Sequence, residues 1–129
     1  MTIRESGEMY LETIYILSHK SSSVRGIDVG AYMGFSKPSV SRAIGLLKKD
    51  NLVITDEQGY IKLTELGEEK AKIIYERHML LSQLLINIGV DEKTATEDAC
   101  RIEHYISEKT FEAIKRHVKK YGKKSLTDY

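Results

Sequence analysis

One short segment of this 129-residue sequence brings together three side chains that bind transition metals. Cys100, Glu103 and His104 stand at positions i, i+3 and i+4, which share one face of a helix. A thiolate, a carboxylate and an imidazole directed at one point are three different donors for a divalent transition metal. In the competing interpretation, Cys100 is a small buried hydrophobe and the other two form a surface pair. The spacing leaves both interpretations open.

Three further residues offer donors that suit the same kind of ion. Met9 and Glu12 stand at i, i+3 in a segment whose apolar periodicity predicts a helix, and His78 lies in a longer amphipathic stretch. A methionine is more often a core residue than a ligand, and a histidine in such a stretch is often half-buried beside a backbone partner. These residues join the cluster only if their helices converge, which spacing does not establish.

A thiolate–imidazole pair is also the centre of some nucleophilic enzymes, and Cys100 with His104 could form one. The sequence offers no third group that would orient such a pair, no oxyanion donor and no glycine-rich phosphate loop. We therefore predict that the protein is not an enzyme and takes no small organic substrate.

Helical periodicity and turn residues predict a mainly α protein with one small β-hairpin. Gly34 supplies a left-handed turn, Ser36 caps the helix that follows, and Pro38 falls in the first turn of that helix, where its missing N–H does no harm. Gly59 completes a turn between two runs of strand formers. The predicted helices cover residues 7–19, 26–33, 36–50, 65–88, 91–106 and 108–121, the predicted strands cover residues 52–55 and 60–63, and a frayed tail covers residues 122–129.

The order of helix, helix, turn, helix and hairpin in residues 7–64 is typical of a winged helix-turn-helix. In that arrangement the helix that begins after Ser36 enters the major groove of double-stranded DNA, and basic residues outnumber acidic ones in residues 24–50. The competing interpretation is a capped helix with no role in nucleic-acid binding. The candidate DNA-binding residues are Ser36, Lys37, Pro38, Ser39, Ser41 and Arg42, with Lys62 on the hairpin.

The composition is that of a globular protein. The sequence is 41% hydrophobic and 30% charged, with a net charge of +1. No apolar run approaches the roughly 20 residues that span a bilayer, and the opening residues lack the apolar centre of a signal peptide. We therefore expect a cytoplasmic protein with no membrane partner. The single cysteine excludes an internal disulfide framework.

Most of the sequence, from about Glu8 to His104, resembles the diphtheria toxin repressor family of iron- and manganese-dependent transcription regulators. The resemblance implies a short two-domain form, with a winged helix-turn-helix DNA-binding domain in residues 1–64 and a helical metal-binding and dimerisation domain in residues 65–129. It also implies a homodimer that binds operator DNA as a repressor, with a metal ion as co-repressor. The motifs that carry it are EMYLETIY at residues 8–15, FSKPSVS at residues 35–41, the pair Arg77–His78, and EDACRIEH at residues 97–104, which is highly specific.

The same resemblance assigns metal ligands. Ser82 and Thr96 stand where the iron-responsive branch has a glutamate and a histidine of its second site, so that site is incomplete in this sequence. The residues that match the primary site of the iron-responsive branch are Met9, Cys100, Glu103 and His104, and those that match ligands of a second site or of the manganese-responsive branch are His78 and Glu12.

The metal that the sequence predicts depends on two sulfur-containing residues, Met9 and Cys100. The manganese-responsive branch is similar but has an aspartate in place of Met9 and a glutamate in place of Cys100. Manganese prefers oxygen, and softer donors favour later metals, so the sequence predicts Fe2+ as the physiological metal, with Co2+, Ni2+ or Zn2+ able to replace it. The alternatives are a manganese-responsive (Mn2+) regulator of the same family and a winged-helix regulator of a non-metal signal.

Overall fold

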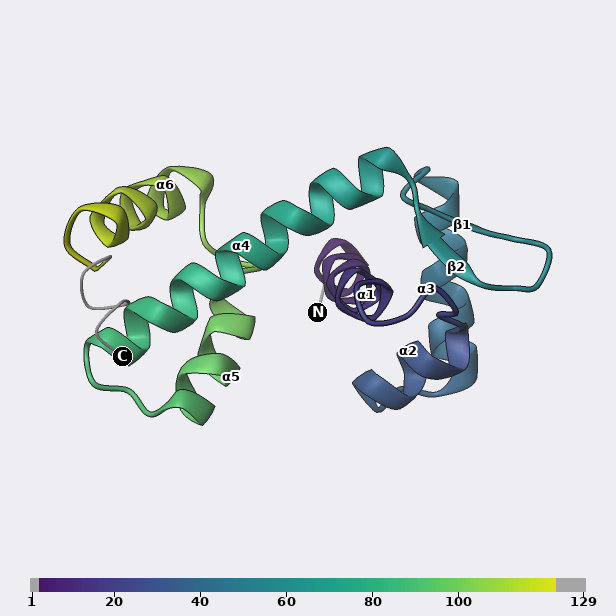
Figure 1. The fold of residues 1–129 in the computed structure, drawn as a ribbon, viewed down its shortest axis with the longest axis horizontal. Helices are drawn as coiled ribbons and strands as arrows, with labels where there is room; N and C mark the ends of the chain where they lie inside the picture. The colour runs from purple at the N-terminus through teal and green to yellow at the C-terminus, as the bar shows by residue number, and fades with distance from the viewer. Residues whose placement is uncertain (1–2, 123–129) are drawn as a thin grey trace. The chain divides into compact units, whose positions relative to one another are not determined.

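The computed structural model describes residues 3–122 of the chain and the side chains of residues 7–120. The chain divides into two compact units, Met1–Ile73 and Ile74–Tyr129, and the long helix α4 (Glu65–Asn87) contributes to both (Figure 1). Residues 123–129 of the predicted frayed tail lie outside the described part of the chain. No helix within residues 3–122 is both long and apolar enough to cross a membrane.

The first unit contains the predicted helices and hairpin in the predicted order, which confirms the winged helix-turn-helix. The backbone of Gly34 has a φ of 73°, the left-handed turn that glycine adopts without strain, and it ends α2. The hydroxyl of Ser36 accepts a hydrogen bond from the amide of Ser39 at 3.4 Å and so caps α3, with Pro38 in the first turn. The elements are α1 (Ile3–Ser18), α2 (Gly26–Met33), α3 (Lys37–Lys49), β1 (Val53–Thr55) and β2 (Ile61–Leu63).

The core of the first unit forms where α1 packs against α2, α3 and β2. The apolar face of α3, which carries Val40, Ile44 and Leu47, is buried, while the opposite face of the same helix is exposed. Burial of this apolar face fixes which residues of α3 point outward. The buried apolar side chains of this unit include Tyr10, Leu11, Ile14, Val29, Val40, Ile44, Leu47, Val53 and Ile61.

The start of α4 is tied to the base of the antiparallel hairpin, in which Val53 pairs with Leu63. The hydroxyl of Thr64 donates to the carbonyl oxygen of Asn51 at 2.6 Å and accepts from the amide of Gly67 at 3.0 Å. A Cβ atom at Gly67 would lie 1.9 Å from the carbonyl oxygen of Leu52. Only a glycine therefore allows α4 to approach the hairpin this closely.

The second unit consists of the rest of α4, α5 (Glu92–Ile102), α6 (Glu108–His117) and a π-helical turn, η1 (Val118–Gly122). The side chain of Asp91 caps α5 by accepting from the amide of Thr94 at 2.9 Å, and that bond lowers the pKa of Asp91. Ser107 caps α6 in the same way through the amide of Thr110 at 3.1 Å. Both caps place a helix start where the sequence predicted one.

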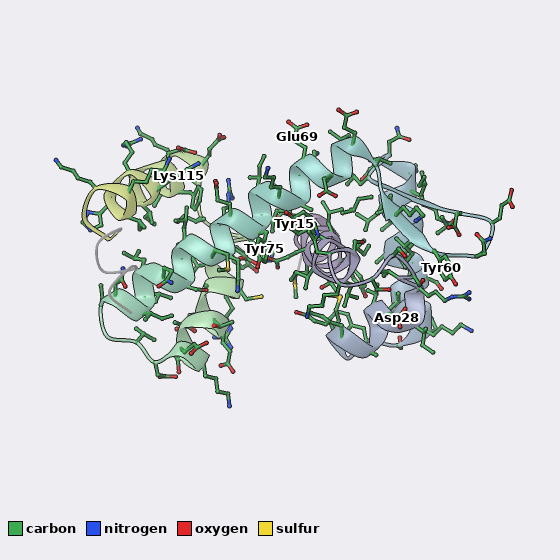
Figure 2. The ribbon with its side chains drawn as sticks, in the orientation of Figure 1. Tyr15, Asp28, Tyr60, Glu69, Tyr75 and Lys115 are labelled. Atoms are coloured by element: carbon green, nitrogen blue, oxygen red, sulfur yellow. The ribbon has the colours of Figure 1, made fainter. Side chains whose placement is uncertain are left out.

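An ion pair joins α4 to α6 within this unit. The ammonium of Lys115 lies 2.9 Å from a carboxylate oxygen of Glu76, and this partner raises the pKa of Lys115, the side chain labelled on α6 in Figure 2. Both side chains are partly exposed, so the pair adds little to stability.

The predicted helix over residues 91–106 is wrong at its C-terminal end, because α5 stops at Ile102. The amides of Tyr105 and Ile106 both donate to the carbonyl oxygen of Ile102, at 3.0 Å each, and this turn leads the chain to the cap of α6 at Ser107. The single helix predicted over residues 108–121 is also different in the structure, where α6 ends at His117 and the wider helical turn of η1 follows it. The Glu103–His104 pair thus lies just beyond a helix end and not within a helix.

Candidate functional site

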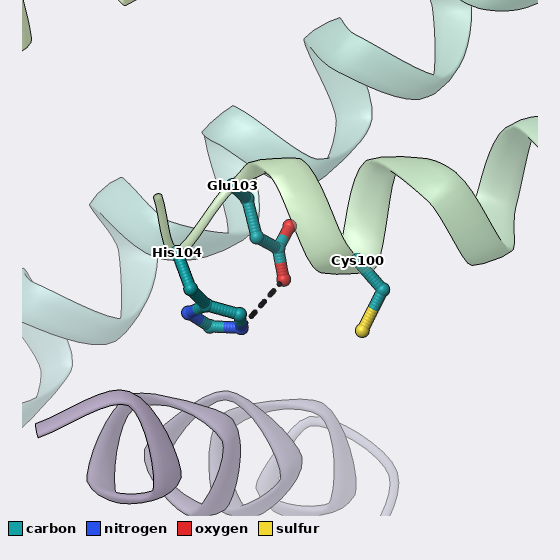
Figure 3. Close-up of side chains that lie close together, drawn as sticks. All are labelled: Cys100, Glu103 and His104. Atoms are coloured by element: carbon teal, nitrogen blue, oxygen red, sulfur yellow. Dashed lines mark ion pairs between the residues drawn. The ribbon is translucent and has the colours of Figure 1, made fainter. Parts of the chain in front are cut away.

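Cys100, Glu103 and His104 lie together at the C-terminal end of α5 (Figure 3). One sulfur, one carboxylate oxygen and one ring nitrogen from the three side chains all lie within 4.8 Å of one another. Glu103 directly follows the last residue of α5, and its φ of −58° and ψ of −25° are still helical. The i, i+3 and i+4 positions therefore still share a face, although the helix itself ends one residue earlier.

The carboxylate of Glu103 is the centre of the cluster. One carboxylate oxygen, Oε1, lies 3.2 Å from Nε2 of His104, the contact drawn as a dashed line in Figure 3, and Oε2 lies 3.1 Å from Nδ1 of His78 on α4. The side chains of Glu103 and His104 are 0% and 2% exposed. A carboxylate so fully removed from water is costly unless cationic or hydrogen-bonding groups face it, and here an imidazole faces each oxygen.

The donor set fits a transition-metal ion. In a tetrahedral site, bond lengths of about 2.0–2.3 Å to nitrogen, oxygen and sulfur place two donors of one ion about 3.3–3.8 Å apart. The three donor atoms lie within 4.8 Å of one another, so binding an ion requires the side chains to close by at most about 1.5 Å. Cys100 is half-buried, and thiolate, carboxylate and imidazole together suit a first-row divalent metal. Cys100, Glu103 and His104 are the residues that would hold it.

The other candidate ligands lie in different parts of the chain. His78 is in the second unit and reaches Glu103. Met9 and Glu12 lie one turn apart on α1 in the first unit, where Met9 is half-buried and Glu12 is 8% exposed. The role of these two residues as metal ligands stays a prediction.

Ser82 and Thr96 stand where the family resemblance places two ligands of a second site. Ser82 is 8% exposed on α4, and its hydroxyl has no hydrogen-bond partner among residues 3–122. Thr96 is exposed on α5. Neither side chain is a strong metal ligand, so a second ion would depend on other residues or on water.

Sequence reasoning missed the contacts that Arg77 makes with the turn after α5 and with α6. Its Nη1 donates to the carbonyl oxygen of Glu103 at 3.4 Å, a long hydrogen bond, and its guanidinium carbon lies 5.3 Å from the ring centroid of Phe111 on α6. No spacing rule relates residues 26 and 34 positions apart, and only the family motif at Arg77–His78 pointed to this part of α4.

The candidate DNA-reading surface lies in the first unit, on the N-terminal half of α3. Ser39 is half-buried, and its oxygen accepts a 2.9 Å hydrogen bond from the hydroxyl of Ser36, so part of its hydrogen-bonding capacity goes to the helix cap. The other candidates are exposed, as a reading helix requires. They are Ser36, which directly precedes α3, with Lys37, Pro38, Ser41 and Arg42 on α3 and Lys62 on β2.

The hairpin is also linked to the loop before α2. The guanidinium of Arg25 lies 4.7 Å from the ring centroid of Tyr60, and its hydrogen bond, together with one from Ser23, lowers the pKa of the Tyr60 hydroxyl. Tyr60 is labelled beside the strands in Figure 2. The amide of Ile61 donates to the carbonyl oxygen of Val24 at 2.7 Å, which places β2 against the same loop.

Comparison with known protein families identifies the class of protein to which the chain belongs. Residues 2–61 match the pattern described as "Iron dependent repressor, N-terminal DNA binding domain", and residues 64–124 match "Iron dependent repressor, metal binding and dimerisation domain". The chain belongs to the iron-dependent repressor family. It is accordingly a DNA-binding and metal-binding transcription regulator, with a DNA-binding domain followed by a metal-binding and dimerisation domain.

Curated relatives of the iron-dependent repressor family cover most of the chain. The transcriptional regulator MntR of Escherichia coli is 31% identical over 94% of this chain and 78% of its own length. The regulator MntR of Bacillus subtilis is 33% identical over 84% of this chain and 77% of its own length. The diphtheria toxin repressor of Corynebacterium diphtheriae is 30% identical over 81% of this chain and 46% of its own length.

Solved structures of the family have the same fold. The manganese regulator SloR is 28% identical with a TM-score of 0.79, and the match covers 92% of this chain and 55% of SloR. IdeR of T. acidophilum is 27% identical with a TM-score of 0.77, and the match covers 89% of this chain and 53% of IdeR. The chain thus spans about half the length of these two structures.

Proposed function

We propose that this iron-dependent repressor family member controls metal-ion homeostasis genes and that Fe2+ is its physiological activator. The observation that carries the proposal is the sulfur of Cys100 within 4.8 Å of donor atoms of Glu103 and His104. Thiolate ligands favour iron and later metals over manganese, which prefers oxygen. Co2+, Ni2+ and Zn2+ would occupy the same donors in purified protein.

Each side chain of the proposed site has a separate task. Glu103 supplies negative charge from a position that excludes water, so its attraction to a cation is weakened little by solvent. His104 is held beside it on the same turn, and Cys100 adds the sulfur that selects for softer ions. When bound, the metal supplies a positive centre that neutralises these anionic donors. From the family resemblance we propose Met9 as a fourth ligand.

We propose that DNA recognition belongs to the exposed first turns of α3. Arg42 can bond guanine or phosphate, the serine hydroxyls can approach base edges, and Lys62 contacts the DNA backbone from the hairpin. A homodimer presents two copies of α3 to the two half-sites of an operator. By linkage, metal that strengthens DNA binding is itself bound more tightly, by the same factor, when DNA is present.

The proposal also includes a domain boundary and a second metal site. The functional boundary lies at residues 64 and 65, where the hairpin gives way to α4, so that the DNA-binding domain covers residues 1–64 and the metal-binding and dimerisation domain residues 65–129. Glu12 and His78 serve a second site, which is incomplete because Ser82 and Thr96 supply no strong ligand.

A manganese-responsive regulator is the second candidate, and the names of the relatives favour it. The Escherichia coli and Bacillus subtilis relatives are both named MntR, at 31% and 33% identity. The solved structure with a TM-score of 0.79 is described as a manganese regulator. The two candidates differ in one property that can be measured, which is the metal that activates DNA binding at the lower concentration.

The deciding experiment uses DNA that favours neither metal. Duplexes that bind the Co2+-loaded protein are selected from a random-sequence library, and binding of a selected duplex is then measured without oxygen against Fe2+ and Mn2+. We expect half-maximal binding at a lower concentration of Fe2+ than of Mn2+. A lower concentration of Mn2+ would favour the manganese-responsive candidate, and metal-independent binding would overturn the proposed mechanism.

A control variant checks that activation passes through the proposed ligands. Cys100→Ser keeps the size of the side chain but replaces sulfur with oxygen, so it should weaken activation by Fe2+ more than activation by Mn2+. Arg101→Met changes the neighbouring residue, whose side chain is 74% exposed and pairs with Asp98, and it should leave the order of the two metals unchanged.

A further inference from the structure

The turn after α5 carries two of the three proposed metal ligands, Glu103 and His104. A side chain from another helix donates a hydrogen bond to the peptide group between them. Nη1 of Arg77, on α4, donates to the carbonyl oxygen of Glu103 at 3.4 Å. That carbonyl belongs to the peptide unit that joins Glu103 to His104. Because a peptide unit is planar, one contact to its oxygen constrains the attachment points of both side chains.

We propose that Arg77 is a positioning residue that sets the geometry of the metal centre through this carbonyl. The inference rests on the proposed metal site at Cys100, Glu103 and His104. The turn needs such support because α5 ends at Ile102, and the last carbonyls of a helix have no amide of their own helix to accept from. Arg77 supplies a donor at the point where the helix stops.

The guanidinium is itself held in place. Its central carbon lies 5.3 Å from the ring centroid of Phe111, which is 2% exposed on α6. Its Nε is buried and has no hydrogen-bond partner among residues 3–122. Contact with a buried ring restricts the plane of the guanidinium, and a hydrogen bond in a site with little water is not easily replaced by solvent. Arg77 thus connects α4, α6 and the turn after α5.

The direction in which metal affinity changes when Arg77 is replaced distinguishes a positioning role from an effect of its charge alone. Arg77 carries a positive charge next to a site that would bind a cation, so if charge alone mattered, removing it would strengthen metal binding. If Arg77 positions Glu103 and His104, removing it weakens metal binding instead. Side chains that orient the ligands of metal sites typically contribute about 10–100-fold in affinity.

Arg101 provides the matched control. It is also an arginine of the second unit and directly follows Cys100, but its side chain is 74% exposed and pairs with Asp98 at 2.9 Å. Arg101→Met therefore removes the same charge at a similar place in the chain without touching the Glu103 carbonyl. Arg77→Lys keeps the charge but lacks the flat, forked donor group that lies against the ring of Phe111.

The experiment is a titration of the metal-free chain with Co2+ in the absence of oxygen, followed by the sulfur-to-cobalt charge-transfer absorption. We expect Arg77→Met to lower Co2+ affinity by about 10-fold or more and to change the cobalt spectrum. Arg101→Met should leave affinity unchanged or slightly higher, and Arg77→Lys should recover part of the loss. The unfolding free energy of each metal-free variant shows whether the loss reflects the site or the fold.

Two results would overturn the inference in distinguishable ways. If the unaltered protein binds Co2+ through sulfur and Arg77→Met binds it equally or more tightly, Arg77 does not position the site. If the unaltered protein shows no sulfur-to-cobalt absorption, the metal site fails and the role of Arg77 fails with it.

Should Arg77→Met not fold, Phe111→Leu provides the test, because it keeps an apolar side chain but removes the ring. We expect a smaller loss of affinity in the same direction, and unchanged affinity would overturn the proposal.

Discussion

Alanine at Gly67 and alanine at Gly45 should change stability in opposite directions. Both glycines lie inside helices, where alanine is favoured by about 1 kcal/mol. A Cβ atom at Gly45 would meet nothing within 4 Å, so Gly45→Ala should raise the free energy of unfolding by about 0.5–1 kcal/mol. A Cβ atom at Gly67 would lie 1.9 Å from the carbonyl oxygen of Leu52, which is part of the backbone and cannot rotate away.

The loss at Gly67 can be worked out from the contacts around it. To relieve the overlap, the first turn of α4 must move away from the hairpin, which stretches the 2.6 Å bond from Thr64 to Asn51 and the 3.0 Å bond from the Thr64 amide to Leu52. Overpacking costs about 1–3 kcal/mol and each weakened hydrogen bond about 1 kcal/mol. After the gain in helix propensity, Gly67→Ala should lower the unfolding free energy by about 2–4 kcal/mol.

Urea denaturation of the metal-free chain, followed by circular dichroism, measures both changes. The two variants control for each other, since each adds one methyl group inside a helix. If Gly67→Ala is as stable as the unaltered protein, α4 does not approach Leu52 as described. If Gly45→Ala is less stable, the exposed position of Gly45 on α3 is wrong.

Three other changes test separate parts of the account. Arg42→Ala should weaken binding to a selected DNA duplex by about 1–3 kcal/mol in a fluorescence titration and leave the unfolding free energy within about 0.5 kcal/mol; unchanged DNA affinity would remove Arg42 from the reading surface. Ser36→Ala should cost about 1 kcal/mol of stability by urea denaturation, because the amide of Ser39 loses its cap; no loss would mean that the cap contributes nothing. Met9→Asp combined with Cys100→Glu should move the activation of DNA binding from Fe2+ toward Mn2+, and an unchanged metal order would refute the argument from sulfur softness.

Local signals were enough to predict most of the fold. Gly34 and Ser36 mark the end of α2 and the start of α3 because each residue type performs a specific backbone task. The end of α5 was missed because residues 103–106 neither break a helix strongly nor cap one. The stop at Ile102 arises from the turn that leads to Ser107, and this depends on where α6 packs.

The candidate metal centre was predictable only where its residues are close in sequence. Cys100, Glu103 and His104 form a pattern because they fall within five consecutive positions. The contact between His78 and Glu103 joins residues 25 positions apart, and that of Arg77 with the Glu103 carbonyl joins residues 26 apart. Helix packing creates these contacts, and no local periodicity records how two helices pack.

The central claim is that a divalent metal binds this chain through the sulfur of Cys100, and X-ray absorption at the metal edge tests it most directly. For the Zn2+-loaded protein, we expect a sulfur scatterer at about 2.3 Å beside nitrogen and oxygen at about 2.0–2.2 Å. The sulfur bond at that distance should be lost in Cys100→Ser. A spectrum of the unaltered protein with nitrogen and oxygen neighbours alone would contradict the account.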